Sequence, residues 1–550
     1  MVLCWHMHQP SYFDPVAGRY VLPWTYLHAI KDYVDMAAHL EAHPGVRAVV
    51  NFSPTLLEQL DDYNRQLMRW RMYRSPLADP LLAALAEPSA VTDPPERQRL
   101  IELCLRAHPN RVIARFPPYL RLYTLAQNCL QDARTLAYLS DEFFADLLVW
   151  FHLAMLGETV RRSDPRVQTL MAREAGFDAA ARNCLIEVIH QQIDSICNRY
   201  LALAESGAVE LAMNPYAHPI LPLLLDLQSG REALPDLPLP SAAIYPGGEQ
   251  RARWQIAHGL EVFEHYFHRR PAGCWPAEGA ISTQAARLFG DYGFAWIASG
   301  RGVLAHSLPD APDPHRPYQL DGSPPIIFRD DTLSDRIGFE YASWHGDDAA
   351  ADLVRHLVNI QGASEHPSQK LVAIIMYGQN AWEYYYENAY HFFGALYRLL
   401  ANESRLELTT FSDVLPRLQP HRLDRLVAGS WIYGTLSTWI GEPQKNAAWD
   451  LLVVAKRDFD TVLAAGTLTA ARAEEAAEAL GRCEASDWWW WFGRDTDPRI
   501  AKEFDALYRA QLRALYYLLD LPVPTAVNTS LVEQRDGGGT VGTMRRGAAP

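Results

Sequence analysis

The chain has 550 residues, of which 49% are hydrophobic and 21% charged, as in ordinary folded globular proteins. Asp and Glu outnumber Lys and Arg by 65 to 50, and the resulting net charge of −15 argues against a nucleic-acid partner. No apolar run is long enough to cross a membrane, and no secretory signal is evident. The seven cysteines are scattered without CxxC spacing, which predicts reduced thiols and a cytoplasmic protein.

Short apolar segments bounded by polar residues, Gly or Pro recur along most of the chain. Such segments are typical of strands buried on both faces of a parallel sheet. Helical patterns lie between them, for example over 251–269 and 283–292, and this alternation predicts an α/β fold built from βα units. The seven predicted strands, which could close a barrel, are 2–5, 46–52, 209–213, 273–276, 294–298, 325–328 and 371–376.

Three regions interrupt or follow the strand pattern. Residues 60–205 lack strand signals and are interpreted as a helical insertion within a first domain that spans 1–405. Helical patterns dominate after about residue 410, which predicts an α-helical domain over 406–525 that completes a cleft. Residues 526–550 are rich in Gly and small residues without periodicity, and they predict a disordered tail.

The sequence WHMHQP closes the first predicted strand. His6 and His8 alternate along an extended segment, so both side chains lie on one side, where a metal could bind. The further ligands that a metal needs are not evident around them. We therefore favour hydrogen bonding by His8 and Gln9, to a ligand or to the loop, and we predict no metal and no cofactor.

Two more polar residues fall at or near the third predicted strand. Glu210 lies inside the strand, where an unpaired buried carboxylate would be costly. We expect either that it points into the barrel mouth and pairs there, or that the strand frays. His218 lies between Pro215 and Pro219 in the loop that follows. It is a candidate ligand-binding residue, and a structural turn histidine is the alternative.

The sequence CWPAEG places a carboxylate where the fourth predicted strand ends. Glu278 follows Trp275 and precedes Gly279, which leaves room for a substrate to approach. A carboxylate at the carboxyl end of a barrel strand is a candidate nucleophile or general base. A surface-loop glutamate is the alternative.

A polar and aromatic loop follows the last predicted strand. Gln379, Asn380 and Trp382 come directly after Gly378, and they are candidate binding residues. A helix start with aromatic packing is the alternative.

Tryptophans are concentrated near the end of the chain. Trp431 and Trp439 stand in loop-like segments, and residues 488–491 are four consecutive tryptophans that follow Asp487. Four in a row cannot all face one core, so we expect at least one to be exposed or to line a cleft. A crowded interface between helices and barrel is the alternative.

Taken in order, these motifs resemble a family 57 glycoside hydrolase. They include WHMHQP, GAVEL, GCWPAEGAIS, YGQNAWEYYYENAYHFF and SDWWWWFG, and the resemblance extends to about residue 525. It implies an incomplete (β/α)7 barrel followed by a helical domain. It also implies a retaining mechanism on α-glucans, as in amylases and 4-α-glucanotransferases, with no required metal.

The resemblance also implies residue roles. Glu278 matches the nucleophile, whereas Tyr377 stands at the position of the acid/base Asp in a motif resembling LDGENAWE. An acidic pair after the fifth strand is replaced by Gly300 and Arg301. The residues expected to bind substrate are His8, Gln9, Glu210, His218, Trp275, Gln379, Asn380, Trp382, Trp431, Trp439, Trp489 and Trp490.

Tyrosine is a poor substitute for a carboxylic acid. Its ordinary pKa is about 10, and loss of general acid catalysis typically costs about 100- to 10,000-fold in rate. Glu383 or Glu387 could in principle replace the acid, although Glu383 matches a family position that coexists with the usual Asp. We therefore expect an α-glucan-active enzyme with impaired catalysis. The alternatives are a non-catalytic α-glucan-binding protein and, less favoured, a metal-dependent mannosidase or deacetylase-like barrel built on His6 and His8.

Overall fold

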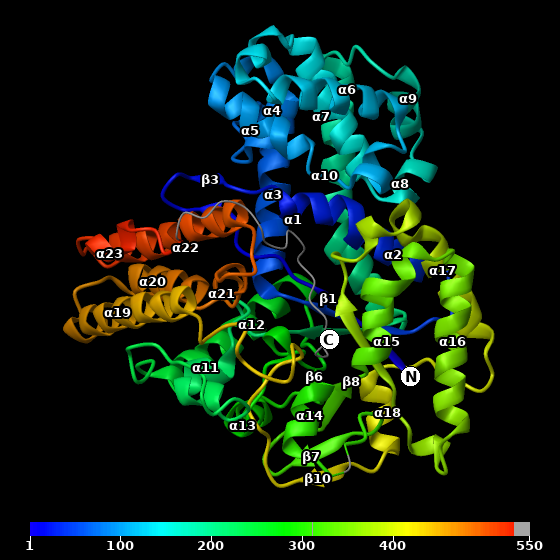
Figure 1. Ribbon diagram of the computed structural model, residues 1–550, viewed down its shortest axis with the longest axis vertical. Coiled ribbons are helices and arrows are strands. Elements are labelled where there is room, and N and C mark those ends of the chain that lie inside the picture. The colour runs from blue at the N-terminus through cyan, green and yellow to red at the C-terminus, as the bar shows by residue number, and fades with distance from the viewer. Residues whose placement is uncertain (311, 533–550) are drawn as a thin grey trace.

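Parallel pairing of short buried strands organises the molecule, which a computed structural model describes over residues 1–310 and 312–532 (Figure 1). In the order of their pairing, β5 joins β4, then β1, β9, β8 and β6, and every pair is parallel. Single parallel bridges from Cys274 to Met213 and to Ile297 return the series from β6 to β5. The bounds are β1 (Val2–Met7), β4 (Ala48–Phe52), β5 (Val209–Met213), β6 (Ile297–Gly300), β8 (Ile326–Arg329) and β9 (Ala373–Tyr377).

Short strands extend the outside of this arrangement. β7 (Tyr318–Leu320) pairs antiparallel with β8, and β10 (His421–Leu423) pairs parallel with β7. β2 (Phe13–Asp14) and β3 (Arg19–Tyr20) form a separate antiparallel pair.

The expected α/β fold is confirmed, and six of the seven predicted strands are present. The predicted strand over 273–276 is reduced to the bridges at Cys274. Pro276 has no N–H to donate to a neighbouring strand, and the backbone turns into the left-handed region at Glu278 and Gly279, with φ of 56° and 57°. The chain therefore leaves the sheet directly after this bridge.

Helices alone connect β4 to β5 in the described chain, in the region predicted as an insertion (upper part of Figure 1). Three of them begin at Asp-Pro, where Asp79, Asp93 and Asp164 accept hydrogen bonds from N–H groups of the first helical turn. The bounds are α3 (Pro54–Tyr73), α4 (Pro80–Ala86), α5 (Pro94–Cys104), α6 (Pro117–Leu130), α7 (Asp141–Met155), α8 (Glu158–Ser163), α9 (Pro165–Arg173) and α10 (Ala179–Glu205).

Further helices pack around the strands. The predicted helices over 251–269 and 283–292 are α12 (Gly248–Phe267) and α13 (Thr283–Asp291). The others are α1 (Trp24–His28), α2 (Val34–Glu41), α11 (Leu221–Leu225), α14 (Arg301–Ser307), α15 (Asp331–Asp335), α16 (Gly346–Gly362), α17 (Tyr390–Asn402) and α18 (Phe411–Val414). None of the helices in the described ranges is long and apolar enough to cross a membrane.

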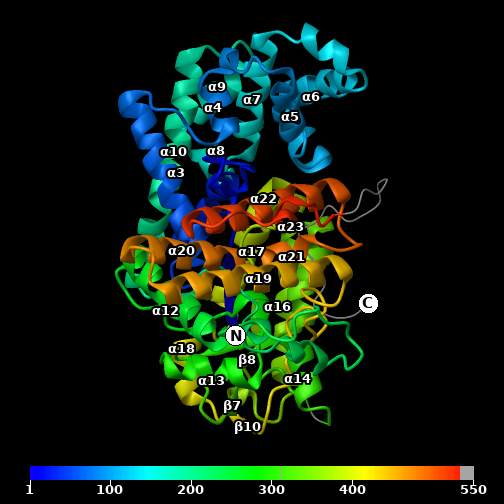
Figure 2. The same ribbon diagram turned by 90° about the vertical axis from the view of Figure 1, so that its left-hand side faces the viewer.

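A last group of helices lies side by side against one flank of the molecule (Figure 2). Its members are α19 (Pro443–Ala465), α20 (Ala470–Cys483), α21 (Asp487–Trp491), α22 (Pro498–Leu518) and α23 (Thr525–Asn528). α23 lies at the start of the predicted tail, with Val527 buried, and the predicted tail from residue 533 lies outside the described residues.

All four tryptophans of 488–491 are buried, so none is exposed, and exposure was one of the two expected arrangements. Successive helical residues point about 100° apart, so four of them surround the helix axis, and neighbouring elements cover every side. Trp488 and Trp489 donate their indole N–H groups to the backbone carbonyls of Arg482 and Lys445. The crowded interface is therefore the better interpretation of this motif.

A buried carboxylate fastens the last helices to α12. Glu484, at the end of α20, is completely buried and accepts hydrogen bonds from Tyr245 Oη at 2.5 Å, Arg251 Nε at 2.7 Å and Gln255 Nε2 at 2.6 Å. A buried charge is tolerated only when it is paired and hydrogen-bonded in this way.

We expect Arg251→Met to lower the free energy of unfolding by about 3–5 kcal/mol, because it leaves the Glu484 charge buried without its partner. The measurement is the midpoint of urea unfolding followed by tryptophan fluorescence. Arg253→Met is the matched control, since Arg253 is 40% exposed on the same helix and its loss should cost less than about 1 kcal/mol. Equal midpoints for the two variants would show that this network does not hold the helices.

Candidate active site

Glu278 stands where the chain leaves the sheet after Cys274. It is buried and has a φ of 56°, a left-handed conformation that costs a residue with a Cβ about 1–2 kcal/mol. Gly279 follows with the same sign of φ, and a Cβ there would lie 2.7 Å from the Trp275 ring, so only glycine fits. Strained backbone of this kind is concentrated at functional sites.

Two side chains donate hydrogen bonds to the Glu278 carboxylate. Tyr377 Oη, at the carboxyl end of β9, lies 2.8 Å from Oε1, and Trp431 Nε1 lies 2.8 Å from Oε2. Burial raises the pKa of Glu278 above its usual range, although both hydrogen bonds favour the charged form. Burial and the Glu278 charge hold the pKa of Tyr377 well above 10, so Tyr377 is a hydrogen-bond donor and a weak acid.

A buried arginine packs on the ring of Trp431 and holds it in position. The guanidinium carbon of Arg329 lies 4.8 Å from the centre of the Trp431 ring, and Arg329 is itself paired with Asp331 and Asp335. Gly300 lies against the Trp431 backbone, where a Cβ would come within 2.4 Å of Cα. The aspartate that the resemblance places at this position therefore does not fit here. Arg301 is exposed.

A chain of histidines leads to the same carboxylate. The rings of His8 and His218 are stacked, with centroids 3.7 Å apart, and His6 Nε2 lies 3.1 Å from His218 Nε2. His218 Nδ1 lies 2.8 Å from Ser486 Oγ and 4.0 Å from Glu278 Oε1.

Hydrogen bonds fix the tautomers of two of these rings. Asn51 accepts the Trp275 backbone N–H through Oδ1, so its amide nitrogen faces His6 Nδ1 at 2.8 Å. His6 must then donate from Nε2 to His218, which leaves a proton on His218 Nδ1. Burial holds the pKa of both rings well below 6.5, so both are neutral. The N–H of His6 is directed at His218, and the N–H of His218 is directed toward Ser486 and Glu278.

His8 also pairs with a carboxylate from the last helices. Its Nε2 lies 2.9 Å from Asp487 Oδ1, and its Nδ1 lies 2.5 Å from Ser53 Oγ. His8, His218 and Asp487 bring potential metal ligands within 4.8 Å of one another. The two rings are inclined by only 13° and stacked 3.7 Å apart, so their nitrogen lone pairs lie in separate, nearly parallel planes. The lone pairs therefore do not converge on one ion as a metal site requires.

Several residues predicted to bind substrate lie elsewhere. Glu210 lies near the amino end of β5, where it accepts hydrogen bonds from Trp296 Nε1 and the Ser412 backbone N–H, so it does not line the barrel mouth. The prediction could not tell the two ends of a five-residue strand apart. The tryptophans that pack in the core are Trp382 on Trp5 and Phe393, Trp439 against Trp490, and Trp489 on Trp449.

The remaining predicted residues surround the site. Trp275 is buried over Gly279, and Gln379 donates to the His8 carbonyl at 2.5 Å. Gln9 is also buried and accepts a hydrogen bond from Tyr12 Oη. Asn380 is partly exposed.

Four contributors were not predicted: Asn51, Arg329, Ser486 and Asp487. Asn51 lies inside the predicted strand 46–52, and Arg329 directly follows the predicted strand 325–328. A polar residue within or at the end of an apolar strand was therefore the available signal. No local signal placed Ser486 and Asp487 here, because 268 residues separate Ser486 from its partner His218.

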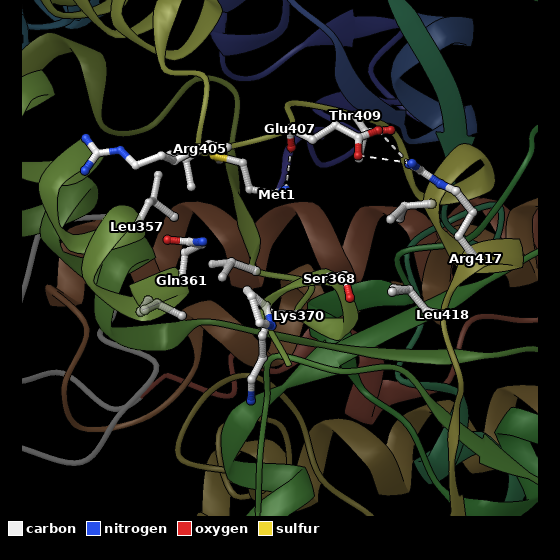
Figure 3. Close-up of a pocket in the computed structure, with 15 residues that line it drawn as sticks. Met1, Leu357, Gln361, Ser368, Lys370, Arg405, Glu407, Thr409, Arg417 and Leu418 are labelled. Carbon is white, nitrogen blue, oxygen red and sulfur yellow. Dashed lines mark hydrogen bonds and ion pairs between the residues drawn. The ribbon is translucent and has the colours of Figure 1, made fainter. Parts of the chain in front are cut away.

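A cavity of about 340 Å³ lies away from these residues (Figure 3). It is lined by Met1 and Val372, at the amino ends of β1 and β9, and so opens at the opposite edge of the strands from Tyr377. Glu407 in its wall accepts hydrogen bonds from Arg417, and the chain-terminal amine donates to its carbonyl (Figure 3). Catalytic groups of α/β barrels lie at the carboxyl ends of the strands, which favours the Glu278 cluster as the site.

Comparison with known proteins decides the family. Residues 2–428 match the family described as glycosyl hydrolase family 57. The chain belongs to this family. A search of curated proteins finds no match.

Solved structures share the fold, and two of the three named here are family 57 branching enzymes. A branching enzyme from Pyrococcus horikoshii has a TM-score of 0.58 at 14% identity over 98% of each chain. A branching enzyme from Thermococcus kodakaraensis has a TM-score of 0.57 at 14% identity, over 94% of this chain and 89% of that one. The α-amylase AmyC from Thermotoga maritima has a TM-score of 0.55 at 12% identity, over 94% and 92%.

We expect Glu278→Gln to raise the melting temperature of this family 57 protein at about pH 7. Burial raises the pKa of Glu278, so the native state is destabilised once that group is charged, and the neutral amide removes the penalty. Below about pH 4 the carboxyl is protonated in both states, so the advantage should disappear. Differential scanning calorimetry at both pH values measures it.

Glu261→Gln is the control, because the Glu261 side chain is 75% exposed and should show no advantage at either pH. A Glu278→Gln variant that is no more stable than the wild type at the higher pH would contradict the account.

Proposed function

We propose that this family 57 protein is a retaining glycoside hydrolase or transglycosylase that acts on α-glucans, with impaired proton transfer. The observation that carries the proposal is the 2.8 Å hydrogen bond between Glu278 and Tyr377. It puts the residue at the nucleophile position against the residue at the acid/base position. Family membership supports an α-glycosidic substrate, and the related structures named above are branching enzymes and an α-amylase.

The strand arrangement supports the proposed architecture. Six parallel strands and the Cys274 bridges form a series that returns to its start, and β8 and β9 are joined by one residue pair. We take this as an incomplete (β/α)7 barrel over 1–405 with its helical insertion. The helices after residue 406 are taken as a domain that completes the site, because Ser486 and Asp487 come from them.

The expected impairment follows from Tyr377. In a retaining glycosidase one carboxyl group attacks the anomeric carbon, and a second, about 5–5.5 Å away, protonates the leaving oxygen. The hydroxyl of Tyr377 occupies the space beside Glu278, and its raised pKa opposes proton release. Nucleophilic attack is therefore retained, and leaving groups that need a proton depart slowly.

A non-catalytic α-glucan-binding protein is the second candidate. The observation in its favour is that both oxygens of Glu278 already accept hydrogen bonds in a buried position. A nucleophile held in this way must loosen one hydrogen bond before it can attack.

We expect Glu278 to react with α-maltosyl fluoride. Fluoride leaves as an anion without a proton, so the missing acid matters little for the step in which the carboxylate attacks C1 and the C–F bond breaks. Mass spectrometry should detect a glycosyl adduct on the peptide that contains Glu278, and a fluoride electrode should record release. Removal of the adduct also depends on proton transfer, which is impaired, so the adduct should persist long enough to be detected.

Glu278→Gln is the control and should give neither adduct nor release. If the wild type releases no more fluoride than this variant but binds maltoheptaose in calorimetry, the protein is a glucan-binding protein and the proposed activity is wrong.

We expect Tyr377→Asp to increase turnover of maltoheptaose by about 100-fold or more, because it restores a carboxylic acid where the leaving oxygen needs one. The gain on α-maltosyl fluoride should be far smaller. Tyr377→Phe is the matched control: it removes the hydroxyl without adding an acid and should bring no gain. Equal turnover by Tyr377→Asp and Tyr377→Phe would show that the residue at 377 does not limit the reaction.

A further inference from the structure

A second carboxylate lies close to Glu278, and it comes from a distant part of the chain. Asp487 is the first residue of α21, and Ser486 before it docks on His218 through two contacts, N–H to the His218 carbonyl at 2.9 Å and Oγ to Nδ1 at 2.8 Å. That same Nδ1 lies 4.0 Å from Glu278 Oε1. His218 thus joins the segment that carries Asp487 to the nucleophile position.

Asp487 has one oxygen paired and one available. Its Oδ1 lies 2.9 Å from His8 Nε2, and its side chain is 11% exposed. Within the described chain, Oδ2 makes no hydrogen bond. A ring nitrogen and a carboxylate oxygen repel one another unless a proton lies between them, so His8 donates its Nε2–H to Oδ1. Oδ2 is then the oxygen of Asp487 on which a proton for transfer can reside.

Other carboxylates near Tyr377 in the sequence are directed away from it. Glu387 is paired with Arg162 at 2.5 Å and Arg115 at 3.3 Å, on the side of the helical insertion. Glu383 lines a small cavity on that same side together with Arg115. Neither carboxylate is in position to replace the missing acid.

We propose that Asp487, paired with His8, is the group that gives a proton to the glycosidic oxygen and takes it back. The inference rests on the proposed glycosidase function and names its second carboxyl group. It explains how a chain with tyrosine at the usual acid position can still cleave an α-linked glucan, slowly.

Cleavage proceeds in two steps. In the first, Glu278 bonds to C1, the bond from C1 to the leaving oxygen breaks, and the proton carried by Asp487 Oδ2 passes to that oxygen. In the second, water, or a sugar hydroxyl in transglycosylation, bonds to C1, the bond from Glu278 to C1 breaks, and the proton released by the acceptor returns to Asp487 Oδ2.

The electrostatics agree with this placement. Burial and then the neighbouring charge of Asp487 raise the pKa of Glu278, and Asp487 also adds to the raised pKa of Tyr377. The charge of ionised Asp487 therefore acts on both Glu278 and Tyr377.

The test is Asp487→Asn in the full chain, assayed with aryl α-maltosides whose leaving phenols range from acidic to weakly acidic, and with α-maltosyl fluoride. We expect kcat/KM to fall by about 100-fold or more for the poorest leaving group and to change little for the fluoride. Added azide, which needs no general base, should speed the variant's turnover of the fluoride and give a maltosyl azide. Asp497→Asn is the matched control, because Asp497 is a buried cap of α22 and should show a uniform, small effect.

If Asp487→Asn lowers kcat/KM equally for all leaving groups, or does not lower it, Asp487 is not the proton donor. The proposed function would still stand in that case, provided that the wild type turns over the fluoride. A wild type that does not turn over the fluoride overturns the proposed function, and the role of Asp487 with it. A leaving-group-dependent loss that Asp497→Asn does not share establishes Asp487 as the proton donor, since a merely structural effect would not depend on the leaving group.

Discussion

A carboxylate taken out of water must be stabilised by hydrogen bonds or by opposite charge, and Glu278 is buried at the carboxyl edge of the strands. Tyr377 and Trp431 each donate one hydrogen bond to it, and the neutral ring of His218 directs an N–H toward it from 4.0 Å. None of these donors fully offsets the cost of burial, since the pKa of Glu278 stays above its usual range. The surroundings therefore leave Glu278 with a raised pKa. A purely structural carboxylate would not need such a shift.

Segments far apart in the chain meet at this carboxylate, and each is held in place by separate contacts. Trp431 is fixed by Gly300 and by the paired guanidinium of Arg329. Ser486 and Asp487 follow Glu484 closely in the chain, and the buried hydrogen bonds of Glu484 anchor this segment to α12. The stability of that anchor and the geometry of the site are therefore linked, even though Glu484 touches none of the reacting groups described.

The sequence predicted much of the framework and the centre of the site. The strands, Glu278 and Tyr377 could be predicted because each is marked by a short local pattern in the sequence. Glu278 and Tyr377 were expected to meet because the carboxyl ends of parallel strands lie at one edge. Glu210 was misplaced because a short strand pattern does not tell its two ends apart. Asp487 was not recognised as a site residue, because its contact with His8 joins positions 479 residues apart and depends on how the last helices pack. The tryptophans after it resembled a binding surface and are core, because other helices cover every face of α21.

The most direct test of the central claim is a crystal structure of Glu278→Gln with a bound maltooligosaccharide. The account predicts an anomeric carbon about 3–3.5 Å from the substituted side chain, with Tyr377 displaced from its hydrogen bond and Asp487 near the glycosidic oxygen. A sugar bound only elsewhere, with the contact from Tyr377 to position 278 intact, would contradict the claim that this cluster is a glycosidase site.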